Sequence, residues 1–301
     1  MERSEQARFD TLYQKHLSTL KLQGKSKSTI DLYSRPLRRL AAFFDRCPDT
    51  LTRDDLKTYF AALVVSHSWS TVKTDRNGIQ FFWRHVLHRD WDFVEIVKPP
   101  VVKTLPDILT TTEIQQLLNT AQEARYHTIL FTIYSMGLRL SEALGLTIND
   151  IDAGRMKVHL RKCKGGKDRF VPLPVKTLKA LRVYWVTHRN PLLIFPEGLT
   201  DEQRSQASRP MSRSSTQKAM QKLVAQCRIN KKVSPHSLRH SYATHLVECG
   251  LNLRAIQDIL GHMRPETTAV YTRLTETTRL NTHKIINNLI DDLSISQGET
   301  K

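Results

Sequence analysis

One arginine lies where the surrounding sequence gives it no structural reason to carry a charge. Arg139 belongs to the segment YSMGLRLSEALGLTINDID, directly after an apolar stretch and the glycine expected to end its helix. A half-buried guanidinium needs an anionic partner, because taking an unpaired charge out of water is costly. That partner is either a carboxylate, Glu142 or Asp150, or a phosphate, which matches the planar and permanently charged arginine fork.

A second anion site is indicated by the segment SPHSLRHSYATHL. Ser234 and Pro235 suit the N-cap and first position of a helix, whose first turns then carry His236, Arg239 and His240 on one side. The positive end of the helix dipole adds to the attraction for an anion. We expect no metal on the two histidines, because the segment reads HSLRH and not H-E-x-x-H, with no acidic ligand nearby.

Five basic residues surround a predicted hairpin turn. Lys164 and Lys167 flank the two glycines of the turn, and Arg161, Lys162 and Arg169 lie beside them. Such a tip is either a solvated surface or a device that enters a DNA groove and contacts phosphates. One of these lysines could also protonate a leaving group.

The segment LGHMRPETTAVYTR supplies His262 after a glycine and Tyr271 nine residues later. A single tyrosine on a helical turn is usually part of the core. Close to arginines, histidines and a lysine, however, its phenol could attack phosphorus and hold a covalent intermediate.

The charge of the whole chain favours a polyanionic partner. The 301 residues include 46 Lys and Arg against 29 Asp and Glu, a formal net charge of +17. The sequence pI is about 9.9, in the range of nucleic-acid-binding domains. Net charge indicates a class of partner and not a reaction.

Several other classes of protein are excluded by the composition. No run of about 18 apolar residues is present, so we expect no membrane span. The N-terminus, MERSEQARFD, lacks the apolar region of a secretory signal, and we expect a cytoplasmic, nucleoid-associated protein. The segment Gly24-Lys25-Ser26 resembles the end of a Walker motif, but Thr19 replaces its first glycine. We therefore assign no nucleotide-binding loop to this segment, and we expect no cofactor.

The spacing of apolar residues predicts two domains. Apolar residues recur every three or four positions through the first hundred residues, which predicts a bundle of about four short helices. Pro99, Pro100 and Pro106 then interrupt the pattern. We place an N-terminal helical domain at 1–98, a linker at 99–108 and a larger domain at 109–301.

The larger domain is predicted to be mainly helical with one small sheet, an α+β fold. Met156, Val158 and Leu160 alternate before the glycine turn and Val171 and Leu173 alternate after it, which predicts a β-hairpin. Residues 187–210 have the composition of a long loop, which would be mobile or functional. Helices are predicted over roughly 111–122, 126–136, 139–146, 212–227, 235–249, 252–260, 266–274 and 282–293.

Taken together, these segments resemble the tyrosine recombinases, the phage integrase family. That family carries an arginine in a G-L-R-x-S-E segment, a lysine in a β-hairpin turn, an H-x-L-R-H helix, a histidine in an L-G-H segment and a tyrosine nine residues after it. The matching residues here follow in the same order: Arg139, Lys164, His236, Arg239, His262 and Tyr271. The resemblance is specific over about 126–280, and it implies a core-binding domain in the N-terminal hundred residues.

The resemblance implies a site-specific DNA recombinase that needs no ATP and no metal. Tyr271 would form a 3′-phosphotyrosyl link, Arg139 and Arg239 would hold the phosphate, and Lys164 would protonate the leaving 5′-oxygen. His236 would serve acid–base chemistry at the tyrosine, His262 would contact the phosphate, and the reaction would pass through a Holliday junction. Further contacts to DNA are expected from Lys162, Lys167, Arg169, His240 and Arg273.

The resemblance also implies an assembly. We expect a protein that is monomeric when free and forms a homotetramer on two double-stranded DNA sites, each with an inverted-repeat core. The apolar stripe of the helix at 282–293 would dock either on a neighbouring protomer or on its own domain. Lambda-type integrases of the family carry a further arm-binding domain. We expect none before residues 1–100 here, and we expect a recombinase of a mobile element. The alternatives are DNA relaxation of the type IB topoisomerase kind and a DNA-binding protein without catalysis.

Overall fold

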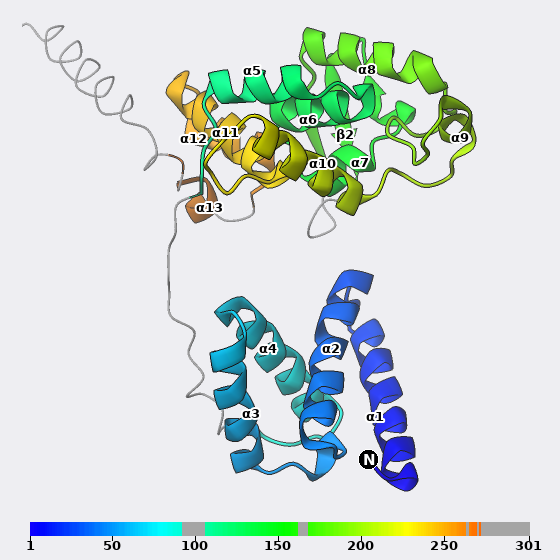
Figure 1. The fold of residues 1–301 in the computed structure, drawn as a ribbon, viewed down its shortest axis with the longest axis vertical. Helices are drawn as coiled ribbons and strands as arrows, with labels where there is room; N and C mark the ends of the chain where they lie inside the picture. Colours follow the sequence, from blue (N-terminus) through cyan, green and yellow to red (C-terminus); the bar gives the residue numbers. More distant parts are fainter. Residues whose placement is uncertain (92–105, 162–167, 263–264, 270, 272–301) are drawn as a thin grey trace, which may run out of the picture. The chain divides into compact units, whose positions relative to one another are not determined.

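The computed structural model describes residues 1–91, 106–161, 168–262, 265–269 and 271 (Figure 1). The chain forms two compact units, Met1–Lys103 and Thr104–Lys301. Residues 99–105 of the predicted linker lie outside the described residues, as does the predicted helix at 282–293. The predicted fold class, mainly helical with a small sheet, is confirmed. None of the helices in the described ranges is long and apolar enough to cross a membrane.

The first unit is the predicted bundle of four helices. They are α1 (Arg3–Leu22), α2 (Lys27–Phe44), α3 (Arg53–Ser66) and α4 (Trp69–His85), with the short 3₁₀ helix η1 (Pro48–Thr50) between α2 and α3. Local sequence explains their starts: Thr52 and Asp55 form a reciprocal capping box at α3. The inward faces of α2, α3 and α4 supply one apolar core, which includes Leu37, Leu56 and Phe82.

The second unit packs its helices around a buried central one. α11 (Pro235–Glu248) lies against α6 (Ala124–Met136), α10 (Arg213–Gln226) and α12 (Leu253–Leu260). Side chains on several sides of α11 are buried, among them Leu238 and Arg239, while His236 in its first turn is exposed and His240 is half-buried. The remaining helices are α5 (Thr111–Thr120), α7 (Leu140–Leu144), α8 (Val175–His188), α9 (Asp201–Gln206), α13 (Pro265–Ala269) and the 3₁₀ helix η3 (Ile148–Asp150).

The sheet has three antiparallel strands in the order β1 (Ile151–Asp152), β2 (Lys157–Leu160) and β3 (Arg169–Pro172). The predicted hairpin corresponds to β2 and β3, in which Val158 pairs with Val171. Sequence reasoning missed β1, because two residues are too short to show an alternating pattern. The hairpin turn, residues 162–167, lies outside the described residues.

The region 187–210 is not the long loop that we expected. It contains α9 and two isolated β-bridges, and Asn190 holds its ends together. The buried Asn190 amide donates to the carbonyl oxygens of Arg204, Ser205 and Ala207, and its oxygen accepts from the backbone of two residues that follow it. One polar side chain therefore orders a segment whose composition alone resembles a flexible connection.

Candidate active site

The site begins where α6 ends and α7 starts. Gly137 ends α6 in the left-handed conformation, and Arg139 is the N-cap residue of α7. Glu142 lies three residues on, and its carboxylate accepts from the Arg139 backbone N–H at 2.9 Å and from the Arg139 guanidinium at 2.7 Å. Arg139 retains 23% of its side-chain exposure. Of the two carboxylates considered for Arg139, the structure thus selects Glu142, while Asp150 pairs with Arg161.

Arg239 comes to the same place from α11. Its guanidinium donates to the carbonyl oxygens of Gly137 at 2.7 Å and Leu260 at 2.6 Å, at the C-terminal ends of α6 and α12. The nearest Glu142 oxygen is 3.7 Å away, and only 1% of Arg239 is exposed. Burial lowers the pKa of Arg239 to about 10, so the side chain stays charged at neutral pH.

Glu142 is the carboxylate that these arginines share. A third arginine, Arg169 at the start of β3, binds it through both terminal nitrogens at 2.9 and 2.8 Å. Burial by itself would raise the pKa of Glu142, but the hydrogen bonds and charges of Arg169 and Arg139 lower it to about 2. One carboxylate facing three guanidinium groups leaves a cluster with a formal charge of +2, suited to an anion.

Tyr271 and three histidines lie beside this cluster. The Tyr271 hydroxyl is 2.9 Å from Nδ1 of His240, and the His236 ring packs edge-on against His240 at a centroid distance of 4.5 Å. The His262 ring stacks on Tyr271 at 6.2 Å, and its Nδ1 hydrogen-bonds Thr268 at 2.9 Å. Tyr271 itself is only 1% exposed.

The pKa shifts in the site keep the three imidazoles neutral at neutral pH, and positively charged arginines lie near the phenol. Burial, followed by nearby charged groups, lowers the pKa of the half-buried His240 and His262 to about 4. Partial loss of solvent, followed by Arg239 and Arg139, also lowers the pKa of the more exposed His236. Burial raises the pKa of Tyr271, while Arg239 and Arg139 act in the opposite direction. At neutral pH the site thus holds a protonated phenol next to neutral imidazoles that can accept a proton.

Comparison with known proteins decides the family. Residues 107–278 match the phage integrase family, and residues 12–93 match the phage integrase N-terminal SAM-like domain. The chain belongs to the phage integrase family of tyrosine recombinases. The resemblance found in the sequence is therefore confirmed. The recombinase is an enzyme that cleaves and rejoins DNA strands in site-specific recombination.

The recombinase matches known relatives over most of its length. The integrase/recombinase y4qK of Sinorhizobium fredii is 36% identical, with 87% of this chain and 84% of the relative covered. Tyrosine recombinase XerD of Halalkalibacterium halodurans is 32% identical, with 85% and 90% covered. The solved XerH recombinase bound to a palindromic difH substrate has the same fold, with a TM-score of 0.66 at 19% identity over 88% of this chain and 82% of XerH.

The structure brings together five of the six residues predicted to be catalytic: Arg139, His236, Arg239, His262 and Tyr271. The sixth, Lys164, lies outside the described residues, as do Lys162, Lys167 and Arg273. Two residues predicted to contact DNA have partners inside the recombinase: His240 meets the Tyr271 hydroxyl, and Arg169 binds Glu142.

Sequence reasoning named Glu142 only as one possible partner of Arg139 and missed its central position. Its spacing three residues after the N-cap of α7 was the available signal, since a glutamate there reaches back to the helix start.

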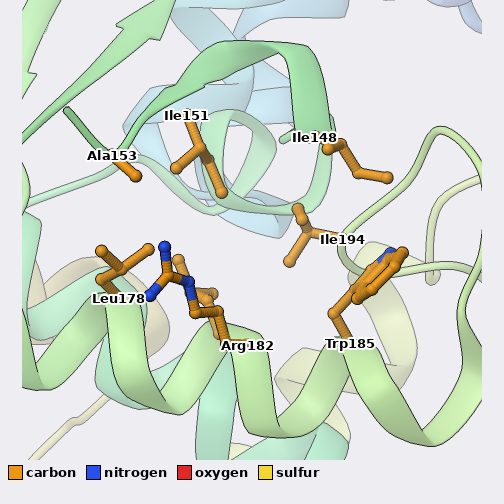
Figure 2. Close-up of a pocket in the computed structure, with 8 residues that line it drawn as sticks. Ile148, Ile151, Ala153, Leu178, Arg182, Trp185 and Ile194 are labelled. Carbon is orange, nitrogen blue, oxygen red and sulfur yellow. The ribbon is translucent and has the colours of Figure 1, made fainter.

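A hollow away from the candidate active site lacks the groups for this chemistry. It has a volume of about 240 Å³ and is lined by Leu178, Arg182 and Trp185 of α8, facing Ile148, Ile151 and Ala153 (Figure 2). Among the described residues of this lining, Arg182 alone is charged. Across the described part of the chain, no group of three or more His, Cys, Asp and Glu side chains is arranged to hold a metal ion.

Proposed function

We propose that the recombinase cleaves each DNA strand by attack of the Tyr271 hydroxyl on the scissile phosphodiester. The observation that supports this most is the hydrogen bond between Tyr271 and the neutral His240, next to a cluster with two positive charges in excess. A phenol is a weak nucleophile unless a base takes its proton and cations stabilise the charge that develops on phosphorus.

The proposed step forms one bond to phosphorus, breaks another and moves two protons. A bond forms between the Tyr271 oxygen and phosphorus, and the bond from phosphorus to the 5′-oxygen breaks. The phenolic proton leaves through the pair His236 and His240, of which His240 makes the direct contact. Lys164 supplies a proton to the leaving 5′-oxygen. The phosphotyrosyl ester retains the energy of the original bond, so rejoining needs no ATP.

The other residues of the site act on the phosphate. Arg139 and Arg239 hold the non-bridging oxygens, and His262 donates a further hydrogen bond once Tyr271 engages the DNA. Because Tyr271 and Arg239 are each 1% exposed, binding of the DNA has to displace the groups that cover them. Lys162, Lys167 and Arg273 add contacts to the DNA backbone.

The complete reaction joins two duplexes. In this proposal, the recombinase is monomeric when free and forms a tetramer on two sites with inverted-repeat cores. The 5′-hydroxyl of the partner strand attacks the phosphotyrosine, and two such rounds pass through a Holliday junction. We place this activity in the cytoplasm on nucleoid DNA, in the service of a mobile element. The net charge of +17 supports the large polyanionic partner.

Capture of covalent adducts tests the proposal. Protein–DNA adducts that resist SDS are recovered from cells expressing the wild type or Tyr271→Phe, and the attached DNA is sequenced. Tyr134→Phe is the matched control, because the Tyr134 hydroxyl also meets a histidine, His245, at 3.0 Å in the same unit. We expect adducts on one inverted-repeat sequence with the wild type and Tyr134→Phe, and none with Tyr271→Phe.

The other outcomes separate the alternatives. Adducts formed by Tyr271→Phe would refute the choice of nucleophile. Adducts scattered over many sequences, with relaxation of supercoiled plasmid and no joining of partner strands, would indicate a topoisomerase activity. DNA bound without any adduct, even with the wild type, would indicate a DNA-binding protein without catalysis.

A further inference from the structure

We infer that Arg169 is a positioning residue of the recombination site, which holds the Glu142 carboxylate so that Arg139 and Arg239 remain available to the scissile phosphate. This inference rests on the function proposed above. It differs from the sequence-based expectation, in which Arg169 contacts DNA directly.

The contacts of Arg169 are those of an internal clamp. Its two terminal nitrogens bind the two oxygens of Glu142 at 2.9 and 2.8 Å, and its Nε donates to the carbonyl oxygen of Ile259 at 3.0 Å. The side chains of Arg169 and Glu142 are 10% and 9% exposed. Arg169 therefore joins the first residue of β3 to α7 and to the end of α12, and all three of its nitrogens have partners within the protein.

The shape of the surrounding backbone fits this arginine. Gly261 ends α12 with a φ of +64°, and a Cβ there would lie 2.9 Å from Cδ of Arg169 and 3.1 Å from its Nε. Such distances leave no room for a side chain, so the glycine of the L-G-H segment provides the space that Arg169 occupies. Two observations, the bidentate pair and this clearance, thus place Arg169 in one fixed position.

The charge of the arginine cluster explains why the pairing of Arg169 with Glu142 matters for the reaction. Three guanidinium groups and one carboxylate give +2 in the wild type, whereas loss of Arg169 would leave two guanidinium groups and one carboxylate, or +1. A buried carboxylate needs compensation, so Glu142 would then draw on Arg139 and Arg239 alone. Both would be held more tightly by Glu142 and less by the phosphate in the transition state, where charge stabilisation matters most.

A direct contact between Arg169 and DNA makes a different prediction. Loss of a phosphate contact weakens DNA binding and reduces the slope of its salt dependence by about one. Loss of a positioning residue lowers the rate of cleavage and leaves binding nearly unchanged. The two roles are thus separated by measuring the dissociation constant and the cleavage rate constant independently.

The experiment is single-turnover cleavage of a nicked duplex whose sequence is the one recovered with the wild type by adduct capture. The full-length variants are Arg169→Met, Arg169→Lys and the double variant Arg169→Met with Glu142→Gln. Arg204→Met is the matched control, because Arg204 also pairs with a carboxylate, Asp201 at 2.6 Å, and donates to a backbone carbonyl, yet belongs to α9. Circular dichroism and the melting temperature establish that each variant is folded.

We expect Arg169→Met to cleave roughly 100-fold more slowly than the wild type, with a dissociation constant for DNA within about threefold, as for loss of one charge-stabilising group. Arg169→Lys keeps the charge without the fork and should fall in between. The double variant restores the formal charge of +2 and should regain at least about tenfold in rate over Arg169→Met. Arg204→Met should cleave at the wild-type rate.

Three results would overturn the inference. The first is cleavage by Arg169→Met at the wild-type rate. The second is a loss of DNA affinity in Arg169→Met that accounts for its slower reaction. The third is a double variant that cleaves as slowly as Arg169→Met. The last would mean that Arg169 has only a structural role. If the wild type itself forms no adduct in the same assay, the proposed function fails instead, and Tyr271→Phe provides the baseline for that comparison.

Discussion

Replacement of Gly261 by alanine tests how rigidly the arginine cluster is held. Gly261 has a left-handed backbone with φ +64°, and its Cβ would lie 2.9 Å from Cδ of Arg169. Arg169 cannot easily move aside, because Glu142 and the Ile259 carbonyl hold its guanidinium. The substitution therefore adds two costs, one from the backbone and one from the contact.

The cost of the backbone and the cost of the contact are separated by comparing alanine at Gly261 with alanine at Gly250. A left-handed backbone costs an L-residue other than glycine roughly 1–2 kcal/mol. Forcing an extra methyl group into a packed region typically costs about 1–3 kcal/mol more. Gly250 is the matched control, because it also has a positive φ, +85°, and nothing lies within 4 Å of its Cβ position. Alanine at Gly250 should thus cost about 1–2 kcal/mol and alanine at Gly261 about 2–5 kcal/mol.

Differential scanning calorimetry of the full-length variants measures the difference. A change of 1 kcal/mol shifts the melting temperature of a unit of this size by about 2–4 °C, so Gly261→Ala should melt roughly 2–12 °C below Gly250→Ala. It should also cleave DNA more slowly, because the Cβ pushes directly against Arg169. Equal melting temperatures for the two variants would refute the reasoning, since they would show that Arg169 yields at no cost.

Two further predictions concern the second unit, Thr104–Lys301. Asn190→Ala removes hydrogen bonds to three carbonyls and two backbone N–H groups. It should lower the free energy of unfolding by about 2–4 kcal/mol and speed hydrogen exchange over 191–207, whereas Asn119→Ala, at an exposed site, should do neither. For Glu142, burial would raise the pKa, but Arg169 and Arg139 lower it from 4.5 to about 2, so the folded state binds the proton more weakly than the unfolded chain. As the pH falls from about 4.5 to 2, the free energy of unfolding of the wild type should therefore fall by about 3 kcal/mol more than that of Glu142→Gln. Urea unfolding of both proteins across that pH range measures this difference. An equal fall in the free energy of unfolding of the two proteins would contradict it.

Local patterns in the sequence determined much of this protein by themselves. The apolar periods predict α2 and α3, and Thr52 with Asp55 marks the start of α3, because a helix start depends on residues three positions apart. The order of Arg139, His236, Arg239, His262 and Tyr271 identified the family, since the family carries these residue types in this order. The two-residue strand β1 and the ordering of 187–210 by Asn190 were missed, because neither leaves a periodic pattern.

Only the tertiary structure decided which charges and hydroxyls meet. His240 and Tyr271 are 31 residues apart, and Arg169 and Glu142 are 27 apart, so no local period relates them. An arginine near a glycine turn is compatible with DNA or with a buried carboxylate, and the packing of β3 against α12 places Arg169 beside Glu142. Burial then sets the proton affinities of the histidines, because the cost of charging a group depends on the solvent that folding removes from it.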